Sequence, residues 1–152
     1  MENIKIDITI NGETNKLSDC LINKIKEFIK GDLTCKKDPL NIMTREDILN
    51  YHGIDKCEFD KCLPFLAKQE VAFKYLKLLI EALNDGWKPD LTDRNQNKWY
   101  NWFRMENGEF VFHGTDYIFG RMDVPSALYF KSEELAIYCK DNFMDLYREY
   151  YL

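Results

Sequence analysis

The stretch from residue 66 to residue 84 most constrains what this chain can fold into. Apolar residues recur along it at the spacing of an α-helix, and they form two stripes rather than one. A helix with two apolar stripes must be covered on more than one side, so we expect it at the centre of the fold. Gly86 and Pro89 predict a sharp end to this helix. The stripes comprise Val71, Ala72, Tyr75, Leu78, Leu79, Ala82 and Leu83 on one side, and Phe73, Leu76 and Ile80 on the other.

The pair Asn107-Gly108 predicts a β-hairpin, because this dipeptide suits the type I′ turn. Residues 98–105 and 109–113 flank the pair as its strands. We expect two more short strands at 117–119 and 127–130, which extend the hairpin to a short antiparallel β-meander.

A last helix is expected after Ser132, a favourable N-cap residue. Its apolar residues form one narrow stripe, which suits a helix lying across one face of a sheet. The stripe consists of Ala136, Cys139, Phe143, Leu146, Tyr147 and Tyr150.

The first part of the chain predicts smaller elements. Residues 4–10 alternate between apolar and polar, which indicates a strand, and Asn11-Gly12 allows a short hairpin although residues 13–16 make a poor return strand. Residues 17–29 have the spacing of a helix. Thr44, three residues before Asp47, opens a short helix that ends near Gly53, and residues 54–64 read as a charged connector.

Together these patterns predict an α+β fold in a single domain. A short antiparallel β-meander packs with a long central helix and a C-terminal helix. Residues 1–43 read as an N-terminal strand–helix addition, and residues 44–152 as the core.

Charge, hydropathy and cysteine usage argue against several classes of function. The net charge of −5 gives no overall basic field for capturing nucleic acid. No apolar run approaches the ~20 residues of a membrane span, and the N-terminus lacks a signal-peptide pattern, so we expect a cytoplasmic protein without membrane contact. The five cysteines are odd in number and scattered, which favours reduced thiols. His52, Cys57 and Cys62 lack a fourth ligand and zinc-site spacing, so neither metal nor cofactor is expected.

No pattern of catalytic residues is present, and we expect a protein that is not an enzyme. His113 has no nucleophile pattern near it and reads as a structural or surface histidine. Acidic pairs such as Glu133 and Glu134 fit the first turn of a helix better than acid–base chemistry. The glycines never fall in a phosphate-binding loop.

The segment 88–104 interleaves aromatic and basic residues, with a local net charge of +2. This pattern serves a stacking platform for single-stranded nucleic acid, a protein-interface hot spot, or plain core packing. Alternation along a strand places Trp99 and Trp102 on opposite faces, so one of them should be exposed. The predicted partner-binding residues are Lys88, Arg94, Lys98, Trp99, Tyr100, Trp102 and Arg104.

Residues 66–152 resemble a family of small uncharacterised phage and prophage proteins with the pattern LNxGWxPD, then NxxKxYxxF, then FKSEELAxY. Leu91 and Asn101 depart from it, standing where family members tend to have Trp and Pro. The resemblance implies a phage or mobile-element origin and hence the bacterial host cytoplasm, without implying an activity. The matching residues are Gly86, Trp87, Pro89, Asp90, Asn95, Lys98, Tyr100, Phe103, Phe130, Lys131, Glu134, Leu135, Tyr138, Phe143 and Leu146.

We therefore expect an accessory binding protein that acts on a host protein or ribonucleoprotein. An inhibitor of a bacterial defence system, such as an anti-CRISPR protein acting on a CRISPR effector, is the example that analogy offers. The alternative is a single-stranded RNA- or DNA-binding protein that uses residues 88–104, with weak binding to free nucleic acid. A small enzyme and a virion component stay open as further classes.

Overall fold

The computed structural model describes residues 7–10, 13–16, 38–119 and 123–152. The chain divides into two units, Met1–Lys37 and Asp38–Leu152. In the first unit, β1 (Asp7–Ile10) pairs antiparallel with β2 (Glu13–Lys16), so the doubtful return strand does form. The helix expected at residues 17–29 lies outside the described residues.

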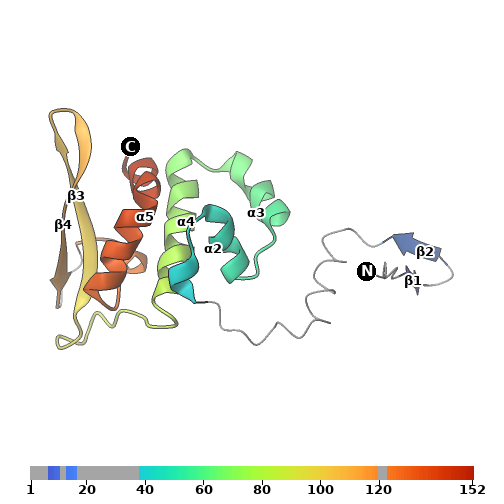
Figure 1. Cartoon of the computed structure of the whole chain (residues 1–152), viewed down its shortest axis with the longest axis horizontal. Helices are drawn as coiled ribbons and strands as arrows, with labels where there is room; N and C mark the ends of the chain where they lie inside the picture. The colour runs from blue at the N-terminus through green and yellow to red at the C-terminus, as the bar shows by residue number, and fades with distance from the viewer. Residues whose placement is uncertain (1–6, 11–12, 17–37, 120–122) are drawn as a thin grey trace. The chain divides into compact units, whose positions relative to one another are not determined.

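The second unit is built in layers, and the α+β prediction is confirmed. Figure 1 shows a two-stranded hairpin, then α5 beside it, then α4, with α2 and α3 beyond α4. Residues 38–43, which the sequence groups with the N-terminal addition, belong to this unit. Its elements are η2 (Pro39–Asn41), α2 (Arg45–Tyr51), α3 (Lys56–Cys62), η3 (Leu63–Phe65), α4 (Lys68–Leu83), β3 (Lys98–Glu106), β4 (Glu109–Ile118), η4 (Ser126–Leu128) and α5 (Glu133–Tyr151).

Helix α4 is the central helix that its two stripes predict. It contacts α2, α5 and η4, and residues of both stripes are buried, among them Leu76 and Leu79. Two residues with positive φ end it, Asp85 at 45° and Gly86 at 81°. The left-handed conformation suits glycine, so the predicted stop signal is confirmed.

Helix α5 buries the predicted stripe, including Phe143 and Leu146, but on more than one side. It lies between α4 and the hairpin (Figure 1), whereas a single stripe suggested one covered face. The backbone leaves helical geometry at Phe143, with φ −135° and ψ 35°. Just before this kink, the side-chain amide of Asn142 donates to the carbonyl of Tyr138 at 2.9 Å, a local bond that competes with the helical ladder.

The expected meander is a single long hairpin in the described residues. Asn107 and Gly108 have φ of 50° and 84°, which confirms the type I′ turn. Strand β4 continues to Ile118 and absorbs most of the third expected strand. In place of the fourth expected strand, at residues 127–130, the chain forms the 3-10 turn η4 followed by a single β-bridge. In this bridge, Phe130 and Trp99 exchange backbone hydrogen bonds of 3.0 and 2.8 Å.

The short helices follow from their caps. Thr44 and Asp47 form the predicted capping box of α2. The expected connector at 54–64 is a helix instead, because the Asp55 side chain accepts from the N–H of Glu58 and caps α3. Of the helices that the structure describes, none has both the length and the apolarity needed to cross a bilayer.

Candidate partner-binding face of the hairpin

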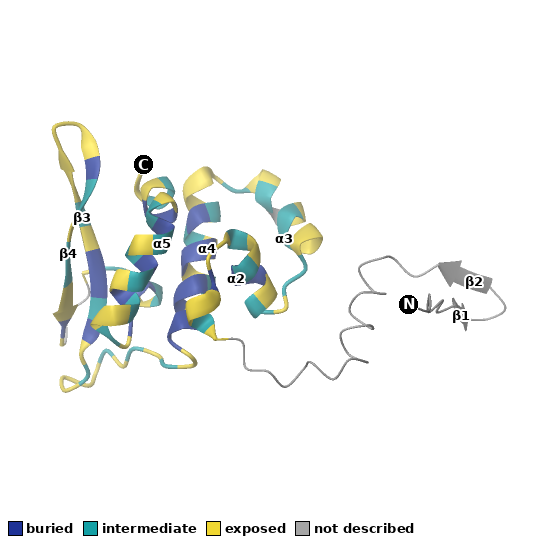
Figure 2. Ribbon diagram, viewed as in Figure 1, coloured by how far each residue is buried: buried dark blue, intermediate teal, exposed yellow. Residues whose placement is uncertain are grey.

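The hairpin has an inner face toward α5 and an opposite, outer face. Trp99, Asn101 and Phe103 lie on the inner face, where Asn101 and Phe103 contact α5. Tyr100, Trp102 and Arg104 lie on the outer face. Figure 2 shows buried residues in the lower part of the hairpin and many exposed ones toward its turn.

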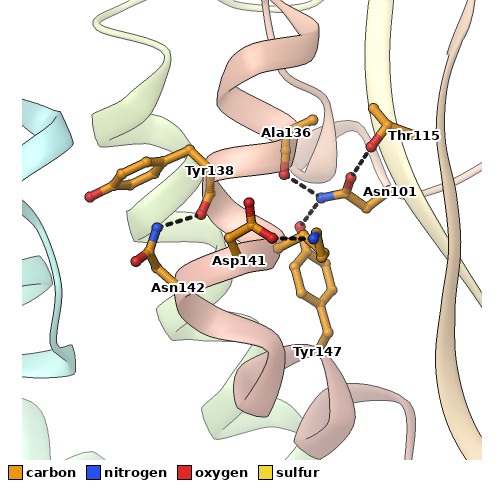
Figure 3. Close-up of polar contacts among 8 residues, drawn as sticks. Asn101, Thr115, Ala136, Tyr138, Asp141, Asn142 and Tyr147 are labelled. Carbon is orange, nitrogen blue, oxygen red and sulfur yellow. Dashed lines mark hydrogen bonds and ion pairs between the residues drawn. The ribbon is translucent and has the colours of Figure 1, made fainter.

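A buried polar network fixes the inner face to α5 (Figure 3). The side-chain amide of Asn101 donates to the carbonyl of Ala136 at 2.7 Å and to the hydroxyl of Tyr147 at 3.3 Å. Its oxygen accepts from the hydroxyl of Thr115 at 2.8 Å. Because the buried amide is satisfied on both sides, this network sets the position of the hairpin on the helix.

Two ionisable groups beside this network are held neutral. Burial raises the pKa of the Cys139 thiol to about 12, although its contact with Tyr147 at 3.5 Å lowers it somewhat. Burial also raises the pKa of the Tyr147 hydroxyl well above its ordinary value. A thiol kept protonated is a poor nucleophile, so Cys139 is a packing residue here.

Lys98 and Tyr100, two of the predicted partner-binding residues, are buried. Lys98 is 0% exposed, and its ammonium donates to the carbonyls of Asp93 at 2.8 Å, Gln96 at 2.9 Å and Phe119 at 3.3 Å. These bonds hold the backbone of the loop before β3 against the end of β4. Tyr100 packs with Ile118 and Tyr129 in a second small core.

The remaining part of the outer face carries an exposed indole. Trp102 is 40% exposed, which confirms that one of the two tryptophans reaches the surface. A register shift between Trp102 and Phe103 leaves His113 as an extra residue on β4, and bulges of this kind redirect side chains. The rings of Trp102 and His113 meet edge to face, with centroids 3.9 Å apart.

Gly114 makes room for this arrangement. It lies opposite Trp102 in the register, and a Cβ at this position would lie 3.2 Å from the indole nitrogen of Trp102. The indole thus lies across the backbone of β4, held by His113 on one side. We define the outer-face patch as Trp102, Arg104, Val111, His113 and Gly114.

Charge around the patch is acidic rather than basic. Arg104 forms an ion pair with Glu106, and the register places Glu109 and Asp116 on the same face. Three carboxylates therefore accompany one guanidinium. Lys88 and Arg94 are exposed in the loop before β3, outside the sheet. The structure does not bring the four predicted bases together around an exposed aromatic surface.

The weak metal candidate is not assembled among the described side chains. The Nε2 atom of His52 donates to the carbonyl of Leu78 at 2.8 Å, which assigns it to packing between α2 and α4. Cys57 is an exposed free thiol. Within the described part of the chain, no group of three or more His, Cys, Asp or Glu residues is placed to hold a metal ion.

Three patch residues, Val111, His113 and Gly114, are not among the residues that the sequence predicts for partner binding. The position of His113 depends on the bulge, and no residue pattern in the sequence predicts one extra residue in β4. The one available signal was Gly114, since glycine inside a strand often marks a bulge or a close approach of another group. Comparison with protein-family models, curated proteins and solved structures found no match to this chain.

Proposed function

We propose that this chain is an accessory binding protein of a phage or mobile element that acts on a host macromolecule. The target class we assign is a protein or ribonucleoprotein of a bacterial defence system, such as a CRISPR effector. The origin rests on the resemblance of residues 66–152 to small phage and prophage proteins. The proposal assigns no reaction to the chain.

The single observation that carries the proposal is the held indole of Trp102. Exposing a large apolar ring to water is unfavourable, and here Gly114 and His113 keep it in one orientation. A pre-positioned tryptophan loses little entropy when a partner covers it, and tryptophan leads the residues that dominate protein interfaces.

The acidic surroundings support a basic protein surface as the partner. The outer face has three carboxylates to one guanidinium, and the whole chain has a net charge of −5. Enzymes that bind nucleic acid carry basic surfaces to neutralise phosphates, so a defence nuclease is complementary to this face. The same charges disfavour the alternative of single-stranded nucleic acid, because Lys98 is buried and Arg104 is paired with Glu106.

The test is infection of a bacterial strain whose CRISPR effector targets the infecting phage. Expression of the chain should raise the efficiency of plating at least 100-fold, and the double variant Trp102→Ala/Arg104→Ala should lose this effect while staying folded. Phe65→Ala is the matched control, since Phe65 is an exposed aromatic, at 87%, on a different element.

The outcomes separate the alternatives. Protection that is unchanged in a folded double variant would remove the outer-face patch from the function. Absence of protection, with submicromolar binding to an arbitrary single-stranded oligonucleotide, would favour the nucleic-acid alternative. Loss of protection in Phe65→Ala alone would move the site to η3.

A further inference from the structure

Strand β4 has an open edge. Strand β3 pairs with β4 on one side and with Phe130 on the other, whereas no described strand pairs with the second edge of β4. The strand is ten residues long, from Glu109 to Ile118. An exposed edge of this length offers backbone groups to an added strand.

The register shows which backbone groups point out of this edge. Trp99 gives both its N–H and its C=O to Phe130, so neither points toward β4. Its partner Tyr117 must then also point away from β3, and the alternation of an antiparallel ladder gives Thr115 the same direction. Consistent with this, the N–H of Tyr117 bonds to the side chain of Asp116 rather than to a strand.

Apolar side chains accompany this edge. Tyr117 and Phe119 are 41% and 47% exposed and meet edge to face with centroids 5.2 Å apart. On α5, Ile137 is exposed one turn before Lys140. The ammonium of Lys140 lies 4.8 Å from the ring centre of Phe112 on β4, which places this flank of α5 on the β4 side of the hairpin.

The charges along the open edge of β4 indicate which kind of segment can bind there. Glu109 and Asp116 lie on β4, and Glu134 and Asp141 share the exposed row of α5 with Ile137. Among the described residues along this edge and this flank of α5, the base is Lys140, and its ammonium is already paired with Asp141. Outside this ion pair, three of the four carboxylates remain, and they favour a cationic segment.

We propose that the open edge of β4 binds an extended, lysine- or arginine-rich segment of a partner protein by strand addition. The segment hydrogen-bonds to the outward N–H and C=O of Thr115 and to the outward C=O of Tyr117, since the N–H of Tyr117 bonds to Asp116. Its alternate apolar side chains meet Tyr117 and Ile137, and its cations face the carboxylates. The backbone contacts of this site do not involve Trp102, so variants at Thr115 and at Trp102 test the edge and the proposed function separately.

The test uses a capped octapeptide of alternating lysine and valine, with glutamate in place of lysine as the charge control. Binding is followed by amide NMR of the full chain. The decisive variant is Thr115→Pro, which removes the outward N–H without removing a bond of the β3–β4 ladder. Thr115→Ala is the matched control, because both variants lose the hydroxyl bond to Asn101 and only proline loses the donor.

We expect the lysine peptide to bind at least tenfold more tightly than the glutamate peptide. Thr115→Pro should weaken it at least tenfold, and Thr115→Ala less than twofold. If the proline variant does not fold, slower hydrogen exchange of the Thr115 amide in the unsubstituted chain, by tenfold or more with the lysine peptide, serves in its place.

Three results would overturn the proposal. Equal binding of the two peptides would contradict the charge argument. Equal effects of proline and alanine, or exchange at Thr115 unchanged by the peptide, would contradict strand addition. Self-association of the chain that Thr115→Pro abolishes would assign the edge to a second copy instead.

Discussion

Lys98 provides the sharpest test of how the hairpin is held. Replacing it by methionine keeps most of the side-chain volume but removes the ammonium that joins three backbone carbonyls from Asp93, Gln96 and Phe119. These carbonyls come from the loop before β3 and from the end of β4. The substitution should therefore loosen the base of the hairpin, not only one contact.

The magnitude follows from the bonds. Two of them, at 2.8 and 2.9 Å, are short, and hydrogen bonds to charged groups contribute about 1.5–3 kcal/mol each, or about 3–6 kcal/mol for the pair. Methionine regains part of this loss, because burying an ammonium costs free energy that a thioether avoids. We expect a net decrease of about 2–4 kcal/mol in the free energy of unfolding.

The assay is urea unfolding followed by tryptophan fluorescence. All three tryptophans, Trp87, Trp99 and Trp102, lie in the unit Asp38–Leu152, so the signal reports on that unit. The control is Lys88→Met, an exposed lysine near the same loop, which should change stability by less than about 0.5 kcal/mol. A Lys98→Met variant as stable as this control would refute the idea that the ammonium organises the loop.

Three further predictions concern the core, the surface charge and the buried thiol. Phe143→Ala and Leu146→Ala should each cost about 2–5 kcal/mol in calorimetry, since both side chains are buried between α4 and the hairpin, and an unchanged midpoint in both would mean that α5 does not dock as described. Free oligonucleotides should bind poorly at physiological salt. Tight binding, with a slope near −0.7 per phosphate in a plot of log affinity against log salt concentration, would contradict the inference that the acidic outer face repels nucleic acid. The contribution of Cys139 to stability should be complete below about pH 9 and decrease as pH rises toward 12, by up to about 1.4 kcal/mol per pH unit, because unfolding returns the thiol to its ordinary pKa. Urea unfolding at pH 7 to 10.5 should show a shallower fall for Cys139→Ser, and identical slopes would exclude the thiol as a cause.

The elements with local signals were predictable from the sequence. The stripes of α4 and α5, the Asn107-Gly108 turn and the capping box of Thr44 each depend on residues close together in the chain, and all are present in the structure. The two covered sides of α5 were not predictable, because the second depends on contacts between the flanks of its stripe and α4.

The candidate site was predictable only in part. Alternation correctly required one exposed tryptophan, but it could not show that Lys98 and Tyr100 are buried. The ammonium of Lys98 is covered by the loop before β3 and by the end of β4, and Tyr100 packs with Tyr129. A basic residue among aromatics looks the same in a sequence whether its ammonium meets phosphates or backbone carbonyls. His113 needed the bulge, which is a property of two paired strands and not of either strand alone.

The position of α5 between α4 and the hairpin also sets the order in which this unit can fold. Helix α4 and the hairpin are synthesised first, and each needs α5 to cover an apolar face. Until α5 emerges, a nascent chain therefore holds two unsatisfied hydrophobic surfaces that can associate with other chains. Cooperative closure in one late step, rather than element by element during translation, is the expected route to the native state.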